Sequence, residues 1–403
     1  MTRLFTSYIA AYRGLPGAVW ALTAATFVNS AGRMVLTLLA LFLTQARGYD
    51  VALAGQIVAA FGVGSVAGGY LGGNLCDRLP LRQVLAGALA LNGLGYIAIL
   101  AADAPWQYFA VVLAAGLFEG AYRPAFSIAL MRLLPAEDRA RGHSLNRTAI
   151  NLGVAMGAAG GGLLAAWDFA LVFWADGLTC LLAAALLWRV VRAVPAQPAP
   201  RPAGGGGPGS PWRDGWFMAF NLVLLLSGLV FFQIQATYGP YLASHYGLGT
   251  QAFGLLFALN GLLIVACELP LVTALKRRDR FRIAGFGALL VGIGFAMLPF
   301  GTSVGYAVLA MVVLSFGEMI LYPMAMSIAM DRAAEGRQGA TMSAYFTMAA
   351  AARLGGPALG SLLYDTAGPE ALWASCGAVG IVCWFAMELL RRSQRRPAHQ
   401  AAA

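Results

Sequence analysis

Ionisable side chains are rare in the long apolar runs of this sequence, and the few that occur there are the first candidates for chemistry. Arg33 follows Asn29 by four residues and Arg123 follows Glu119 by four residues, so each pair lies on one face of a helix. In apolar surroundings an arginine can bind an anionic or carboxylate-bearing group, and a carboxyl group can take up and release a proton. We therefore expect Arg33, Asn29 and Arg123 to bind a substrate and Glu119 to carry a proton.

Glu318 is the second candidate for carrying a proton, and Tyr322 follows it by four residues. No basic residue lies one helical turn from Glu318. For Glu119 another interpretation stays open, in which it only neutralises Arg123. Glu318 is therefore the stronger candidate for a functional carboxyl group, and Tyr322 is a candidate for substrate binding.

No grouping of residues suggests a metal, nucleotide or catalytic site. His143, His245 and His399 have no cluster of cysteines or carboxylates at the spacing of metal ligands. The sequence has no P-loop, which argues against an ATP-driven pump. No nucleophile can be paired with a base. We expect no metal, no cofactor and no enzymatic activity.

The composition shows which elements must position these residues. Sixty per cent of the 403 residues are hydrophobic and 11% are charged, against about 25% charged in an ordinary soluble domain. Because a transmembrane helix needs about 20 mostly apolar residues, the chain has room for twelve spans. These are residues 16–43, 51–76, 84–102, 105–134, 139–166 and 168–191, then 214–243, 250–275, 282–300, 304–331, 338–364 and 369–390.

A segment rich in proline and glycine divides the spans into two sets of six. Residues 193–212 cannot form a helix and have nothing apolar to bury, so they are expected to be a solvated linker. The expected domains are a six-helix bundle over 1–192, this linker, a second six-helix bundle over 213–392, and a tail over 393–403.

Basic residues gather on one side of the expected membrane. Of 27 Lys and Arg, 22 fall in the tails and the even-numbered connections; the exceptions are Arg33, Arg123, Arg147 and Arg353 within spans and Arg47 on the other side. The positive-inside rule then places both termini in the cytoplasm. The net charge of +10 is thus explained by membrane topology, and we expect no nucleic-acid partner.

The two halves repeat each other at an offset of 199 residues. Equivalent pairs include Glu119 with Glu318, Pro124 with Pro323, and Trp174 with Trp373. Six helices per half give the copies a parallel topology, which places a substrate site near the midplane between the halves. The expected fold is an all-α membrane protein of twelve transmembrane helices in two six-helix bundles related by a pseudo-two-fold axis.

The connection between the second and third spans carries a family signature. Its sequence GNLCDRLPLRQVL, from Gly73 to Leu85, resembles the cytoplasmic motif G-x-L-x-D-R-x-G-R-R-x-x-L of the major facilitator superfamily. Pro80 and Leu81 depart from it. The resemblance implies a cytoplasmic gate that an Asp and an Arg lock in one state. The gate residues expected are Gly73, Asp77, Arg78 and Arg82, together with Glu268 near the cytoplasmic end of the eighth span.

Two glycine motifs point to one branch of that family. The glycines Gly153, Gly157 and Gly161, and later Gly356, Pro357 and Gly360, resemble the motif G-x-x-x-G-P-x-x-G-G of drug-proton antiporters. Close helix packing alone is the alternative explanation. Gly116 replaces the arginine of the family's R-x-x-Q-G pattern, which puts the proton-relay role of that arginine in doubt here.

The resemblance also implies that spans one, four, seven and ten line the central cavity, which adds Gln233 and Thr237 of the seventh span as substrate-binding candidates. It implies a monomeric, proton-coupled exporter of drug-like compounds, peptides or metabolites in the bacterial inner membrane. A lipid or lysolipid flippase, or an importer of an organic anion or sugar, stays open on the same fold. A non-transporting membrane receptor is a further alternative.

Overall fold

The computed structural model describes residues 14–135, 138–190, 211–275, 278–332 and 338–400. Every regular element in these ranges is a helix, which confirms the expected all-α class. Residues 193–210 of the predicted linker and the last three residues of the predicted tail lie outside the described part.

Among the described residues the chain forms two compact units. The first takes residues up to Leu38 and those from Ala60 to Val190, and the second takes Leu39–Ala59 and the residues from Pro211 onward. Residues 39–59 group with the second unit because they contact its helices. The backbone N–H of Ala52 donates to Asp365 Oδ2 at 2.7 Å, and Leu41 packs against Gly239. The predicted domain boundaries stay a prediction.

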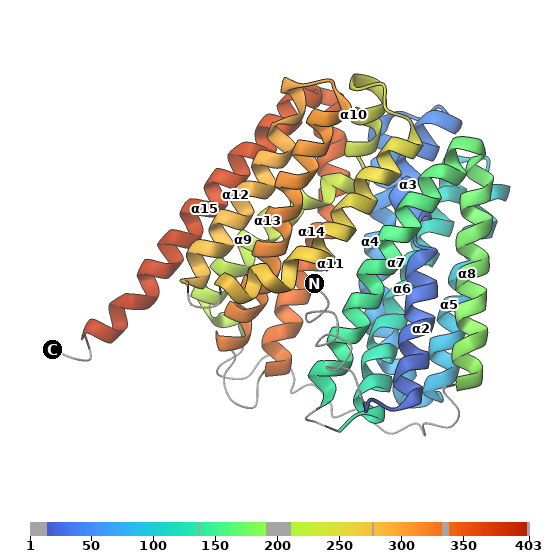
Figure 1. The fold of residues 1–403 in the computed structure, drawn as a ribbon, viewed down its shortest axis with the longest axis horizontal. Coiled ribbons are helices and arrows are strands. Elements are labelled where there is room, and N and C mark those ends of the chain that lie inside the picture. The colour runs from blue at the N-terminus through green and yellow to red at the C-terminus, as the bar shows by residue number, and fades with distance from the viewer. Residues whose placement is uncertain (1–13, 136–137, 191–210, 276–277, 333–337, 401–403) are drawn as a thin grey trace. The chain divides into compact units, whose positions relative to one another are not determined.

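The helices of the first half follow the order of the predicted spans (Figure 1). They are α2 (Gly17–Ala31), α3 (Val35–Leu41), η1 (Phe42–Ala46), α4 (Val51–Arg78), α5 (Leu81–Ala98), η2 (Ile99–Ala101), α6 (Pro105–Leu133), α7 (Arg139–Trp167) and α8 (Phe169–Val190). Helix α5 packs against α6 and α8, and α2 packs against α7 and α8. Small and branched side chains such as Leu22, Ala25 and Leu89 fill this core.

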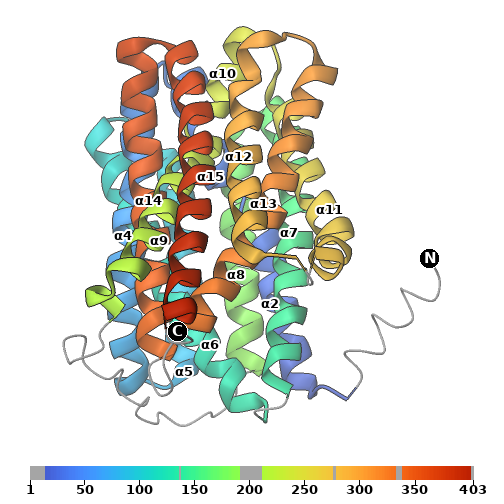
Figure 2. The same ribbon diagram turned by 90° about the vertical axis from the view of Figure 1, so that its left-hand side faces the viewer.

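The second half continues with another set of packed helices, seen from the side in Figure 2. They are η4 (Pro211–Arg213), α9 (Gly215–Phe231), η5 (Phe232–Gln235), α10 (Tyr238–His245), α11 (Thr250–Leu275), α12 (Arg280–Ala296), η6 (Leu298–Phe300), α13 (Val304–Arg332), α14 (Gln338–Ala367) and α15 (Pro369–Gln400). Helix α12 packs against α13 and α15, and α14 packs against α9.

Eleven helical stretches in the described ranges are long and apolar enough to cross a membrane. They account for every predicted span except 338–364. The 30-residue helix α14 occupies that place, but its many alanines, glycines and hydroxyl residues lower its mean hydropathy.

The first and seventh predicted spans are interrupted, whereas the apolar pattern indicated continuous helices. Helix α2 ends at Ala31 and α3 begins at Val35, while α9 ends at Phe231 and α10 begins only at Tyr238. The ends of α2 and α9 are 200 residues apart, close to the repeat of 199. Both halves therefore interrupt the equivalent helix at nearly the same position of the repeat, next to Arg33 in one half and Gln233 in the other.

Candidate functional site

One carboxylate lies between two arginines in the first unit. Glu119 Oε1 is 3.0 Å from Arg33 Nη2 and 3.6 Å from Arg123 Nη2. The Glu119 side chain is 5% exposed, against 25% for Arg33 and 50% for Arg123. Because Arg33 also takes part, the contact is more than the i,i+4 pair of one helix. With all three groups ionised, the cluster carries one net positive charge.

Glycines fix the position of α6, the helix that carries Glu119 and Arg123. A side chain at Gly116 would overlap the carbonyl oxygen of Phe61 in α4, and one at Gly120 would overlap that of Ser65. The backbones of α4 and α6 are thus in direct contact, as small residues allow inside a membrane. This explains why the arginine of the related motif is absent at position 116, where no side chain fits.

The interruption between α2 and α3 holds Arg33 at its place. The turn Gly32–Met34 is closed by Asp176 of α8, whose Oδ2 accepts a hydrogen bond from the backbone N–H of Val35 at 3.0 Å. A side chain at Gly32 would overlap Thr179 of the same helix. Asp176 is fully buried. The charge of Asp176 within an apolar span could have identified it as a candidate from the sequence. The resemblance, however, implied that the sixth span does not line the central cavity.

Asn29 does not accompany Arg33 in its contact with Glu119. Its Oδ1 accepts a hydrogen bond from Cys180 Sγ at 3.3 Å, and the residue is 3% exposed. Its partner lies on α8, one helical turn beyond Asp176. A role for Asn29 in binding substrate stays a prediction.

Glu318 occupies the middle of α13 in the second unit, close to polar side chains. Asn260 Nδ2 of α11 donates to Glu318 Oε2 at 3.0 Å and to Ser315 Oγ at 2.9 Å. Tyr322 packs its ring edge-on against Phe231, with 5.5 Å between centroids. Asn260 is a neighbour that sequence reasoning missed, because it lies in the eighth span and the resemblance implied that spans one, four, seven and ten line the cavity.

Gln233 and the glycines of α14 form one contact, although the sequence predicted them for separate roles. Gln233 Nε2 donates to the backbone oxygens of Gly356 at 2.8 Å and of Leu229 at 2.9 Å. Its Oε1 accepts from Thr237 Oγ1 at 3.0 Å, and a side chain at Gly360 would overlap it. Gln233 and Thr237 are both buried. Their polar atoms thus support the interrupted seventh span.

The glycines of α7 pack against α2 and the turn that follows it. A Cβ at Gly153 would lie 2.7 Å from Ser30 Cβ, and one at Gly161 would lie 2.8 Å from Met34 Cβ. A side chain at Gly157 would overlap the carbonyl oxygen of Ala31. The predicted packing motif thus follows α2 up to the turn that carries Arg33. Pro357 is buried within α14.

The predicted gate residues between the second and third spans lie in the last turns of α4 and the first turn of α5. Only Leu79 and Pro80 separate these two helices. The side chain of Asp77 and the burial of Gly73 are outside the described part of the structure. Arg78 ends α4 and is exposed. The Arg82 guanidinium lies 4.1 Å from the ring centroid of Trp188 in α8. Glu268 is half-buried near the end of α11.

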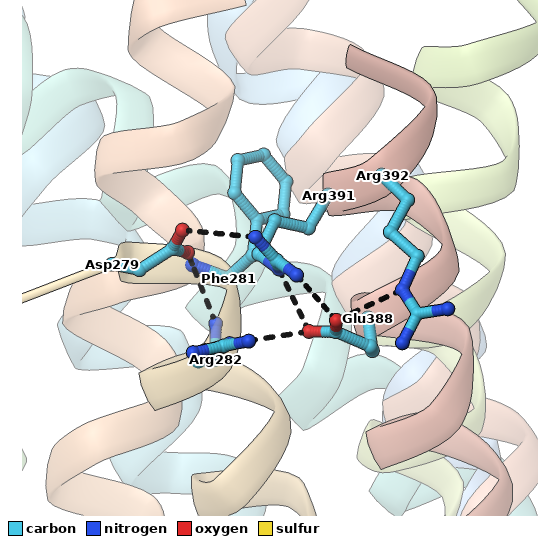
Figure 3. Close-up of polar contacts among 6 residues, drawn as sticks. All are labelled: Asp279, Phe281, Arg282, Glu388, Arg391 and Arg392. Atoms are coloured by element: carbon cyan, nitrogen blue, oxygen red, sulfur yellow. Dashed lines mark hydrogen bonds and ion pairs between the residues drawn. The ribbon is translucent and has the colours of Figure 1, made fainter. Parts of the chain in front are cut away.

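A charge cluster joins α12 and α15 in the second unit (Figure 3). Asp279 caps α12 by accepting hydrogen bonds from the backbone N–H groups of Phe281 and Arg282. Glu388 pairs with Arg282 at 3.4 Å, with Arg392 at 3.0 Å, and with Arg391. Arg391 also lies 3.8 Å from Asp279. The cluster connects the start of α12 to residues 388–392 of α15.

Asp214 caps α9 in a similar way. It accepts hydrogen bonds from the backbone N–H groups of Trp216 and Phe217 and pairs with Arg332 Nε at 2.8 Å. Burial acts to raise the pKa of Asp214, but the hydrogen bonds from Arg332 and these backbone groups outweigh it and leave the pKa below its usual value. The ionised carboxylate is thus the form that holds α9 to the end of α13.

Comparison with known protein families shows which family the chain belongs to. The family model described as Major Facilitator Superfamily matches residues 22–357, well over half of the chain. The chain belongs to the Major Facilitator Superfamily. The resemblance stated from the signature loop is thereby confirmed.

Two curated members of the superfamily are similar to the chain over most of their length. A Na(+), Li(+), K(+)/H(+) antiporter of Planococcus maritimus is 23% identical, covering 78% of this chain and 81% of the antiporter. The multidrug resistance protein MdtH of Cronobacter sakazakii (strain ATCC BAA-894) is 25% identical, covering 81% and 82%. With its apolar spans, this Major Facilitator Superfamily chain is a transporter and a multi-pass inner-membrane protein.

A solved structure carries the same fold. A mutant of the nucleoside transporter NupG superposes with a TM-score of 0.81 at 14% identity, covering 93% of this chain and all of that chain. At this identity the likeness shows the fold alone. It confirms the Major Facilitator fold that the repeat and the span count predicted.

Proposed function

We propose that the chain is a proton-coupled exporter of small molecules that carry an anionic group, such as peptides, other carboxylate-bearing metabolites or anionic drug-like compounds. An antiporter and a multidrug resistance protein among its relatives support ion coupling and export. Both termini would lie in the cytoplasm, as the distribution of basic residues indicates. Transport would proceed by alternating access through movement of the two halves.

The observation that supports an anionic group is the cluster of Arg33, Glu119 and Arg123. A charged side chain within the membrane costs from about 2.5 to more than 10 kcal/mol, depending on the method, so such groups are retained for function. The two arginines exceed the charge of Glu119 and stay 25% and 50% exposed. A substrate carboxylate would bind them and replace Glu119 as the partner of Arg33.

Glu318 is the group to which we assign the exchange of a proton. Asn260 donates to its carboxylate, and a neutral amide can hydrogen-bond either the ionised or the protonated carboxyl group. The side chain therefore keeps a partner when its charge changes. Glu119, in contrast, lies between two arginines that favour its ionised form.

Proton flux driven by substrate tests the proposal. Purified protein in liposomes with an internal pH indicator is given dipeptides, organic anions and cationic drugs. We expect an anionic or zwitterionic compound to move protons in the wild type, and Glu318→Gln to abolish that movement because the amide cannot ionise. Glu370→Gln makes the same change at an exposed position at the start of α15 and should retain the flux.

Three outcomes would contradict the proposal. Undiminished proton flux in Glu318→Gln would exclude this carboxyl group as the proton carrier. Transport of cationic compounds alone would exclude the role assigned to the two arginines. Movement of a labelled lipid between leaflets, without flux of any soluble compound, would favour the flippase alternative.

A further inference from the structure

Asp176 is a buried carboxyl group that the proposed mechanism does not use. It lies in α8 with no exposed surface. One oxygen, Oδ2, accepts the hydrogen bond from the backbone N–H of Val35 at 3.0 Å. The other oxygen, Oδ1, is buried and has no hydrogen-bond partner among the described residues. Each carboxylate oxygen can accept two hydrogen bonds, so Oδ1 is left unsatisfied.

The charged and titratable groups around Asp176 come from three neighbouring segments and its own helix. Arg33 comes from the turn after α2, Tyr96 from α5, Glu119 from α6 and Cys180 from α8, and each interacts electrostatically with Asp176 or shares its surroundings. Arg33 is the one positive charge among them, and its guanidinium is directed to Glu119. In the described part of the chain Asp176 forms no ion pair within 4 Å.

An ionised carboxylate in this place is compensated only by the backbone N–H groups of Val35 and Met34 and by Arg33, whose guanidinium pairs with Glu119. A buried charge without a paired partner is far more costly than a buried neutral group, and such groups avoid the cost by neutralisation. A proton on Oδ1 removes the charge and leaves Oδ2 free to accept from Val35. The unsatisfied oxygen is therefore the atom at which a proton fits.

We propose that Asp176 is a second proton-binding site, in the first unit, and that its protonation decides which carboxylate Arg33 pairs with. When Asp176 holds a proton, Arg33 pairs with Glu119, as the structure shows. When the proton leaves to water, the Asp176 carboxylate competes with Glu119 for Arg33. Because Val35 ties Asp176 to the turn that carries Arg33, the exchange takes place over one short segment.

This site extends the proposed function, since it adds a proton to the transport cycle and connects it to the arginine that binds substrate. A purely structural role is the alternative, in which Asp176 only closes the turn between α2 and α3. An amide in place of the carboxyl group can fulfil the structural role but cannot bind and release a proton. The side-chain amide introduced by Asp176→Asn would still accept from Val35 but could never ionise, so this substitution preserves the turn and removes the proton.

Two measurements on the full chain test the site. The first is the ratio of protons to substrate moved in liposomes, where Asp176→Asn should lower the ratio while retaining downhill exchange of substrate. The second is infrared difference spectroscopy of wild type against Asp176→Asn, which should show the carbonyl band of a protonated carboxylic acid at neutral pH. Asp365→Asn is the matched control, because Asp365 also accepts from a backbone N–H but is exposed.

The two measurements separate this inference from the proposed function. If the wild type moves no protons with any substrate, the proposed function fails, but the infrared band still reports whether Asp176 holds a proton. An unchanged proton-to-substrate ratio in Asp176→Asn would overturn the second site. The lack of a protonated carboxyl band for Asp176 at any pH at which the protein stays folded would overturn it as well.

Discussion

Glu119 is the residue on which the first-unit cluster depends, because its single carboxylate lies next to two arginines. Breaking a buried ion pair by removing one partner costs more than the pair contributes, since the other charge stays behind without compensation. The partial exposure of Arg33 and Arg123 moderates this cost but does not remove it.

We therefore expect Glu119→Gln to lower the stability of the protein by about 3 kcal/mol, at the low end of the range for buried pairs. Thermal unfolding of the purified protein in detergent would measure the change. The double variant Arg33→Gln, Glu119→Gln should recover part of the loss, because it removes a positive charge together with the negative one. Strictly additive losses would show that the two side chains do not interact in solution.

The contacts of Glu119 also show which properties of single residues could be predicted from the sequence and which could not. Arg33, Glu119 and Arg123 were identifiable because charge is conspicuous in an apolar span. Their contact was not, since Arg33 and Glu119 are 86 residues apart in the sequence. Asn260 and Asp176 gain their significance only from the side chains that they meet.

At the scale of the helices, α7 and α2 are held together by glycine contacts that end at the turn before α3. Gly153, Gly157 and Gly161 face α2, whereas nothing lies within 4 Å of a Cβ placed at Gly160. In this protein the motif thus forms a packing surface between α7 and α2. Gly160, which lies between two glycines of the motif, therefore has space for a side chain that they lack.

That difference predicts the effect of adding a single methyl group. Gly157→Ala should destabilise the protein by about 1–3 kcal/mol, the usual cost of overpacking a close contact, because the methyl group would overlap the carbonyl oxygen of Ala31. Gly160→Ala should leave stability unchanged or raise it slightly, since alanine favours the helix. Thermal unfolding of both variants compares them directly, and equal losses would contradict the packing surface.

The interrupted helices show the limit of local sequence at this scale. Nothing between Gly32 and Met34 stops a helix as proline would. The interruption is accompanied by Asp176 and Thr179, which come from α8 and lie more than 140 residues later. A helix break that depends on a distant partner needs no proline among its own residues.

At the scale of the whole molecule, the distribution of basic residues predicts the orientation of the chain. A green fluorescent protein fused after the last residue should fluoresce, because the C-terminus is expected in the cytoplasm. Alkaline phosphatase fused there should be inactive, since it folds only outside. The same phosphatase inserted at Gly247, in the connection between α10 and α11, should be active. The opposite pattern would reverse the orientation.

The sequence by itself determined the family and the positions of the apolar spans, eleven of which form helices long and apolar enough to cross a membrane in the described ranges. It also predicted two related halves. The predictions of spans, halves and family follow from the length of the apolar runs, the placement of charge and the repeat, which can all be read directly from the sequence. Only the tertiary structure decided which polar groups meet: Arg33 with Glu119, Val35 with Asp176, and Asn260 with Glu318. Such contacts depend on the rotation of each helix about its axis and on the helix it packs against, and in a membrane close packing of small residues governs both.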